Sequence, residues 1–122
     1  MKNQRHKARE IAVSTLYSLD FNSELPPSSI KLFASYLING TIEHLDEIDE
    51  LISKYSTNRP INKIDYVDRN ILRISFFQLM HDKDTHPTII IDEAVKLSQA
   101  LSNDVSFKFI NGILDTYAKA TK

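Results

Sequence analysis

The 122-residue sequence has no cysteine and only two glycines. The lack of cysteine excludes disulfide bonds and any metal site built on thiolates, and it fits a reducing compartment. There is no apolar run of membrane-spanning length and no signal peptide, so we expect a soluble, cytoplasmic protein. The formal net charge of −1 shows no excess of either sign. Any charged binding surface must therefore come from the arrangement of the charges.

Alternating strand patterns are also scarce, whereas apolar residues recur at helical spacing along most of the chain. The sequence therefore predicts an all-α fold, with residues 1–122 as one domain. The segment around residues 64–79 is apolar on so much of its circumference that we expect it to be the central helix. Predicted helices cover residues 3–20, 30–55 with a break near Asn39–Gly40 or shortly after, about 64–79, about 88–101, and a last helix reaching Tyr117 whose cap is Asn103, Asp104 or Ser106.

Positive charge gathers at the start of the chain. Lys2, Arg5, Lys7 and Arg9 lie within the first nine positions with no acid among them, and His6 can add partial charge. Because this arm runs directly into the first predicted helix, its cations are anchored to the core, which suits the repeating phosphates of a nucleic acid. The alternative is a solvated start of the chain without a binding role.

Negative charge gathers in one block. Residues 43–50 carry five acids and no lysine or arginine. Such a block is usually a solvent-exposed helix face. It can also bind a basic partner while the cationic arm binds nucleic acid.

Motifs for catalysis or metal binding are absent or incomplete. Asp82, Asp84 and Glu93 match three positions of a calcium loop, but Pro87 stands where the loop requires a sharp turn, usually made by glycine. His81 and His86 leave a zinc site open, although they lack the one-turn spacing of a helical ligand pair. There is no phosphate-binding glycine loop and no nucleophile motif. We therefore expect no enzyme activity, no metal and no cofactor.

The segment that opens the last predicted helix is the second candidate for RNA contact. Phe107 and Phe109 are two residues apart and cannot share one helix face. One of them can be an exposed surface on which a base stacks, with Lys108 near a phosphate. Alternatively, both rings are buried against different neighbours. Gly112 costs helix stability, which suggests that another helix approaches closely there.

Several segments, in this order, resemble the NusB family of bacterial transcription antitermination factors. The resemblance covers nearly the whole chain. It rests on residues 5–13 with Leu16–Tyr17, on 48–52, on 67–74, on 91–95 after Pro87, and on 108–115.

This resemblance implies an all-α domain of about six to seven helices, arranged as two small helical bundles that pack together. It implies binding of boxA RNA together with the ribosomal protein NusE, within the RNA polymerase antitermination complex on ribosomal RNA operons. The family's RNA-contacting residues map onto Arg5, His6, Lys7, Arg9, Tyr17, Ser106, Lys108 and Phe109, and its protein-partner surface maps onto Tyr17 and Asp68.

The arm departs from the family pattern. His6 stands where many relatives have arginine, and a histidine or lysine cannot form the bidentate phosphate contact of a guanidinium. RNA affinity should then be lower and should depend on pH through His6. The competing hypothesis is a self-associating helical interaction module, in which a homodimer covers the RNA surface.

Overall fold

The computed structural model describes residues 9–14, 16, 32–102 and 105–121. Helices account for most of these residues, and no strand occurs among them, so the all-α prediction is confirmed for the described ranges. Residues 9–14 and 16 are helical and are called the first helical segment below. The other elements are α2 (Leu32–Glu43), α3 (Leu45–Tyr55), the 3-10 turn η1 (Ile61–Lys63), α4 (Tyr66–His81), α5 (Pro87–Leu101) and α6 (Ser106–Ala120).

Helix α4 is the central element, as its broad apolar surface predicted. It packs against α2, α3, α5 and α6. Phe76 and Phe77 are both buried, although they point in different directions from the helix. Because every neighbouring helix covers part of its surface, α4 positions the rest of the molecule.

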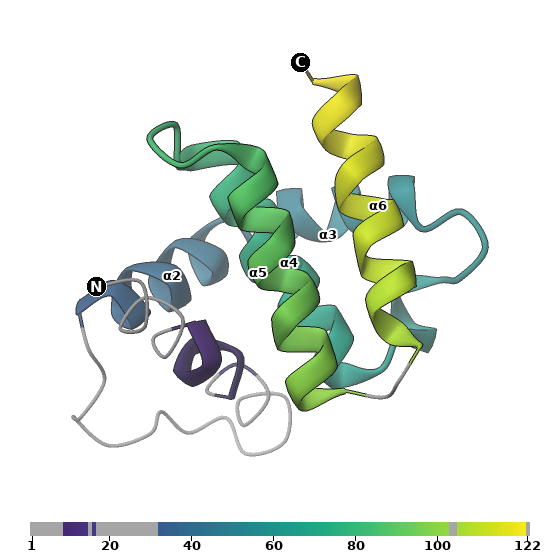
Figure 1. The fold of residues 1–122 in the computed structure, drawn as a ribbon, viewed down its shortest axis with the longest axis horizontal. Coiled ribbons are helices and arrows are strands. Elements are labelled where there is room, and N and C mark those ends of the chain that lie inside the picture. The colour runs from purple at the N-terminus through teal and green to yellow at the C-terminus, as the bar shows by residue number, and fades with distance from the viewer. Residues whose placement is uncertain (1–8, 15, 17–31, 103–104, 122) are drawn as a thin grey trace.

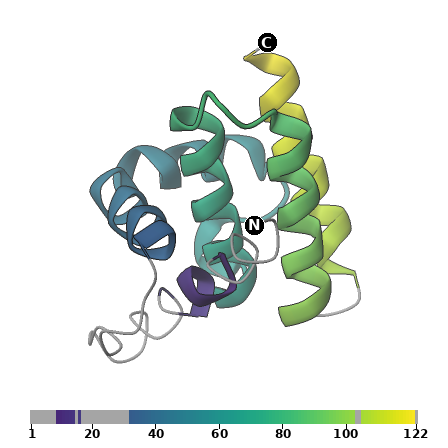
Figure 2. The same ribbon diagram turned by 60° about the vertical axis from the view of Figure 1, so that its left-hand side comes forward.

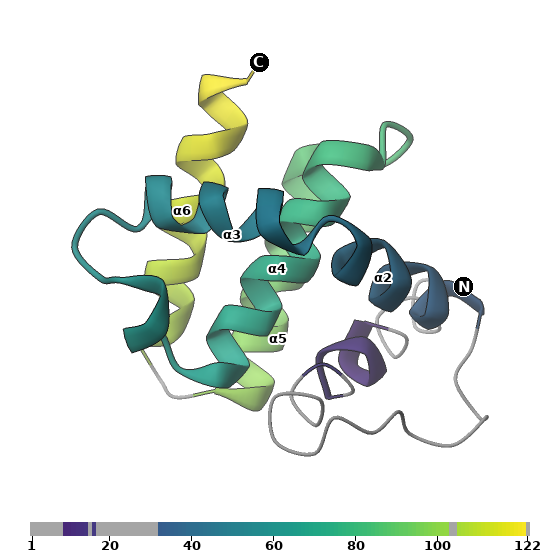
Figure 3. The ribbon, with the colours of Figure 1, turned by 180° about the vertical axis from the view of Figure 1, so that it is seen from behind.

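Two groups of helices share α4. On one side, α4, α5 and α6 pack together, and α3 crosses α4 and α6 from behind (Figures 1 and 3). On the other side, α2 and the first helical segment pack near the middle and end of α4 (Figure 2). One continuous apolar cluster connects both groups, so the two small bundles form a single core.

The long helical pattern of residues 30–55 is interrupted at His44, shortly after Gly40 as expected. Gly40 itself lies inside α2, where the ring of Phe77 occupies the space a Cβ atom would need. The close helix approach that the sequence suggested for Gly112 therefore occurs at Gly40. That suggestion was wrong for the part of the chain that the structure describes, because a Cβ on the exposed Gly112 would have no neighbour there within 4 Å.

Helix α5 starts at Pro87, one residue before the predicted start, and the isoleucines 89–91 are helical. Proline suits a first helical position because its missing N–H would have no partner there. The preceding loop uses its polar side chains locally: His86 Nδ1 accepts from the Thr88 N–H at 3.1 Å, and Asp82 Oδ1 accepts from the N–H groups of Asp84 and Thr85. The metal-like spacing of this loop thus corresponds to turn and cap formation.

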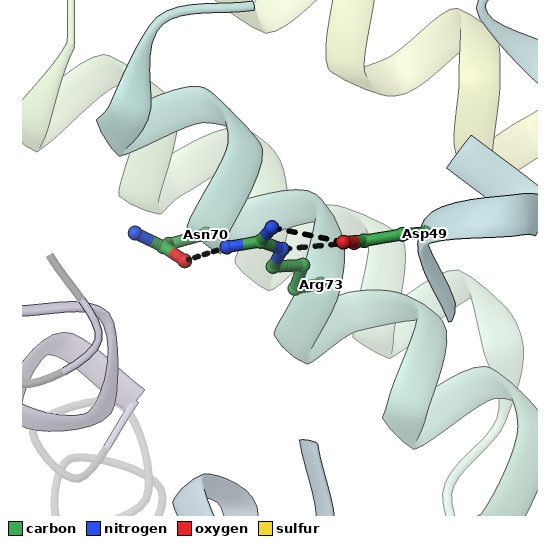
Figure 4. A network of polar contacts seen from close by, with 3 residues as sticks. All are labelled: Asp49, Asn70 and Arg73. Atoms are coloured by element: carbon green, nitrogen blue, oxygen red, sulfur yellow. Dashed lines mark hydrogen bonds and ion pairs between the residues drawn. The ribbon is translucent and has the colours of Figure 1, made fainter. Parts of the chain in front are cut away.

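An ion pair fixes α3 on α4 (Figure 4). The Arg73 guanidinium donates from Nε to Asp49 Oδ1 and from Nη2 to Asp49 Oδ2, both at 2.9 Å, and from Nη1 to Asn70 Oδ1 at 3.2 Å. Such a bidentate contact sets angle as well as distance. Asp49 and Arg73 both belong to the segments that resemble the NusB family, and here they have a structural role.

Candidate nucleic-acid interface

The predicted site residues divide into three groups. Arg5, His6, Lys7 and Tyr17 lie outside the described residues. Arg9, Asp68 and Ser106 are buried. Lys108 is exposed and Phe109 is half-buried. The site described below therefore depends on the second half of the chain.

Arg9 faces the interior of the molecule. Its side chain is 6% exposed, its Nε donates to Gln78 Oε1 at 3.3 Å, and its Nη1 lies 4.0 Å from Glu93 Oε2. These contacts join the first helical segment to α4 and α5. In this structure the Arg9 guanidinium contacts protein side chains, and its RNA contact stays a prediction. The sequence pattern could not reveal these protein contacts, because Gln78 and Glu93 are far away along the chain.

The first turn of α6 combines a structural serine with an accessible lysine. Ser102 Oγ donates to the buried Ser106 Oγ at 3.2 Å, which links the end of α5 to the start of α6. The N-cap of α6 is Val105, which makes no side-chain hydrogen bond, so the expected cap at Ser106 was wrong; Asn103 and Asp104 lie outside the described residues. Lys108 extends into solvent from the same turn.

Both candidate aromatic residues of α6 are half-buried, which is intermediate between the two alternatives above. Phe109 has a partner that sequence reasoning missed. The guanidinium of Arg59, from the loop before η1, lies 4.2 Å from the centre of the Phe109 ring. This distance is typical of a cation–π contact. Because the two residues are 50 positions apart, only the tertiary structure shows the pairing.

A second cation–aromatic pair lies on α4. The Arg69 guanidinium is 4.5 Å from the ring centre of Tyr66, which is 41% exposed. Helices α4 and α6 and the turn η1 all begin at this end of the molecule (Figures 1 and 3). We call it the basic end and define it by Arg59, Lys63, Arg69 and Lys108, together with the aromatic residues Tyr66 and Phe109. Cations beside partly open rings suit the phosphates and bases of single-stranded RNA.

Asp68, predicted to meet a protein partner, is 1% exposed in the first turn of α4, and its Oδ1 has no hydrogen-bond partner among the described residues. It therefore lies beneath the surface. Apolar side chains are exposed at the same end: Leu101 at the end of α5 is 38% exposed, and Val105 before α6 is 67% exposed. They give this end an apolar area beside its cations.

Comparison with known proteins agrees with an all-helical architecture in which two small bundles share a central helix. Residues 6–119 match the model of the NusB family, so this chain belongs to the NusB family. The transcription antitermination protein NusB of Nitratiruptor sp. is 38% identical and aligns with 97% of this chain and 94% of its own length. The protein of the same name from Thermodesulfovibrio yellowstonii is 36% identical over 95% of this chain and 92% of its own.

Solved structures show the same fold. A structure of T. maritima NusB superposes with a TM-score of 0.85 at 31% identity, covering 94% of this chain and 90% of the other. A structure of the antitermination factors NusB and NusE in complex with double-stranded RNA superposes with a TM-score of 0.84 at 27% identity, covering 98% and 99%. No helix among the described residues is long and apolar enough to cross a membrane.

Proposed function

We propose that this protein is a transcription antitermination factor that binds boxA-type single-stranded RNA together with NusE and keeps RNA polymerase elongating on ribosomal RNA operons. It works in the cytoplasm, and by binding, not by catalysis. The family match over residues 6–119 carries the proposal, and the basic end supplies chemistry suited to RNA. A relative of this fold has been solved with NusE and RNA, which supports the same partners here.

The basic end divides RNA binding between backbone and bases. Lys63, Lys108 and Arg69 hold phosphates, which positions the strand without reading its sequence. Phe109 is the stacking surface for an unpaired base, and Arg59 moves off the ring to hold a fourth phosphate. Arg5, His6, Lys7 and Tyr17 lie outside the described residues, and their RNA contacts are proposed from the family resemblance alone.

NusE binds beside this RNA surface. Tyr66, Leu101 and Val105 provide the exposed apolar contacts, and the buried Asp68 supports the first turn of α4 beneath them. A basic partner placed there would lengthen the phosphate-binding surface. Four phosphate contacts by this chain correspond to a salt slope of about −3 for a single strand, so the partner adds affinity that the chain alone lacks.

Fluorescence anisotropy tests the proposal directly. Labelled boxA RNA and a scrambled RNA of equal length are titrated with the protein, with and without NusE, at two salt concentrations. We expect a preference for boxA that increases with NusE, and affinity for both RNAs that falls with salt. Equal binding of both RNAs under every condition would contradict the proposal.

The second candidate function is a self-associating interaction module whose RNA surface is covered. The apolar side chains exposed at the basic end favour it, because a second copy could bury them. Sedimentation velocity separates the two functions. A dimer that resists salt and does not bind RNA supports the module, whereas a monomer that binds boxA supports the antitermination factor.

A further inference from the structure

The end of the molecule opposite the basic end contains a large hollow. Helices α4 and α6 end there, α5 begins there, and α3 passes beside them (Figures 1 and 3). The hollow has a volume of about 770 Å³, and its lining includes the apolar side chains of Met80, Ile91 and Tyr117. Glu47 on α3 and Asp115 on α6 also line it. An apolar floor with charged walls is typical of a recognition site.

A second hollow of about 380 Å³ lies where α2 meets α3. Glu47 lines both hollows. The imidazole rings of His44 and His81, one from each hollow, are in tilted contact with their centres 4.3 Å apart. Ile42, 45% exposed, belongs to the second hollow. The two hollows therefore adjoin at Glu47 along the start of α3, and we call them together the acidic groove.

The charges around this groove are mainly negative. Four exposed acids lie on the α2–α3 side: Glu43, Asp46, Glu47 and Glu50. The loop that follows α4 adds the half-buried Asp82 and the exposed Asp84. The rim also carries Lys83 and Lys119, but Lys119 Nζ lies 2.9 Å from Asp115 Oδ2, so its charge is offset locally. The helix dipoles do not add to this charge, because the C-terminal ends of α4 and α6 meet the N-terminal ends of α3 and α5 at the groove.

Tyr117 responds to this field. Burial raises the pKa of its hydroxyl above the usual value, and the nearby Tyr55 and the negative charge of Glu47 raise it further. The phenol thus stays neutral on the floor of the groove. The charge of Glu47 therefore acts on the groove floor as well as on its rim.

We propose that the acidic groove binds a basic amphipathic segment of a protein partner, with an apolar side chain in the larger hollow and lysine or arginine side chains along α3. Charge complementarity identifies this occupant, because nucleic acid would be repelled by the same surface. The groove lies at the far end of α6 from Lys108. Since α6 has 15 residues, the two sites are about 20 Å apart and can be occupied together.

Three synthetic peptides of 14 residues test the proposal. The first has leucine and tryptophan on one helical face and arginine on the other. The second replaces the arginines by glutamate, and the third replaces the apolar residues by serine. With isotope-labelled protein, we expect the first peptide to bind with micromolar affinity and to shift the amide signals of Glu47, Met80 and Tyr117. Both control peptides should bind at least tenfold more weakly.

A matched pair of protein variants separates the groove from simple charge attraction. Glu47→Lys and Asp92→Lys change the net charge equally, and both residues are exposed, but Asp92 does not line the groove. Glu47→Lys should weaken the first peptide at least tenfold, and Asp92→Lys less than threefold. Circular dichroism verifies that both variants are folded, and boxA binding should be unchanged in both.

Three results would overturn the proposal. Equal losses in the two variants would mean nonspecific attraction. Signal shifts confined to the basic end would place the peptide elsewhere. A dimer of the protein that Glu47→Lys dissociates would make a second copy the occupant. None of these readings depends on RNA binding, so the groove and the antitermination function can fail separately.

Discussion

The two ends of this molecule differ in charge although the same helices, α4 and α6, connect them. Arg59, Lys63, Arg69 and Lys108 are at the end where these helices begin, and Glu47, Asp82 and Asp115 are at the end where they finish. Cations at helix N-termini and acids near helix C-termini oppose the helix dipole. Arg69 and Lys108 are therefore placed unfavourably for their own helices, whereas Glu47 in the first turn of α3, Asp68 in the first turn of α4 and Lys119 in the last turn of α6 are placed favourably. Helix stability alone does not explain the charge difference between the ends, and the two proposed binding sites would use it.

The largest expected effect is a loss of stability that distinguishes Arg9, in the core, from Lys108, at the basic end. Arg9→Ala removes a buried guanidinium and leaves Glu93 without it, which should cost about 2–3 kcal/mol of unfolding free energy. RNA affinity per folded molecule should stay the same. Urea unfolding and anisotropy measure the two quantities. Lys108→Ala is the control: it should keep the stability and weaken boxA and scrambled RNA alike. If Arg9→Ala lost RNA affinity at full stability, Arg9 would belong to the RNA surface.

The two glycines give a matched pair of glycine-to-alanine substitutions, because Gly40 lies inside α2 and Gly112 lies inside α6. Gly40→Ala places a methyl group against the Phe77 ring, and such overpacking costs about 1–3 kcal/mol. Gly112→Ala meets no neighbour and should stabilise α6 by about 0.5–1 kcal/mol. Thermal unfolding monitored by circular dichroism gives both values. Opposite signs are expected, and a loss of stability in both variants would show that α6 needs the glycine after all.

Within the basic end, Phe109 and Arg59 should have different roles. Phe109→Ala should weaken boxA binding by about tenfold and reduce the preference over scrambled RNA, because base stacking contributes about 1–3 kcal/mol. Arg59→Ala should weaken both RNAs and reduce the salt slope by about 0.7. Anisotropy at several salt concentrations distinguishes them. Identical losses of preference in the two variants would show that they act as one unit.

The smallest effect concerns the acidic groove at alkaline pH. Because the pKa of Tyr117 is higher in the folded protein, the folded state keeps the proton that the unfolded state releases near pH 10. Stability from this group is complete below pH 10 and is lost as the pH rises through the folded pKa. Tyr117→Phe should therefore lose less stability between pH 9 and pH 11 than the parent protein. Urea midpoints at both values measure this, and parallel losses would contradict it.

Local patterns predicted the helices well but could not show the tertiary contacts of individual residues. The apolar periodicity identified α4 as central, and the break after Gly40 was located to within a few residues. The role of Arg9 could not be read in this way, because its partners come from α4 and α5. The Arg59–Phe109 pair was missed for the same reason, since a loop arginine has no periodic signal that points to a helix 50 residues later.

The sequence alone determined the all-helical class, the central position of α4, the family and the separation of basic from acidic segments, because these properties depend on spacing and composition along the chain. Only the tertiary structure decided which cations are exposed, which glycine receives a neighbouring ring, and where the acids form a groove. These properties depend on which helix faces meet. Packing brings distant residues into contact, so Arg9 joins the core while Arg59 lies against Phe109 at the basic end.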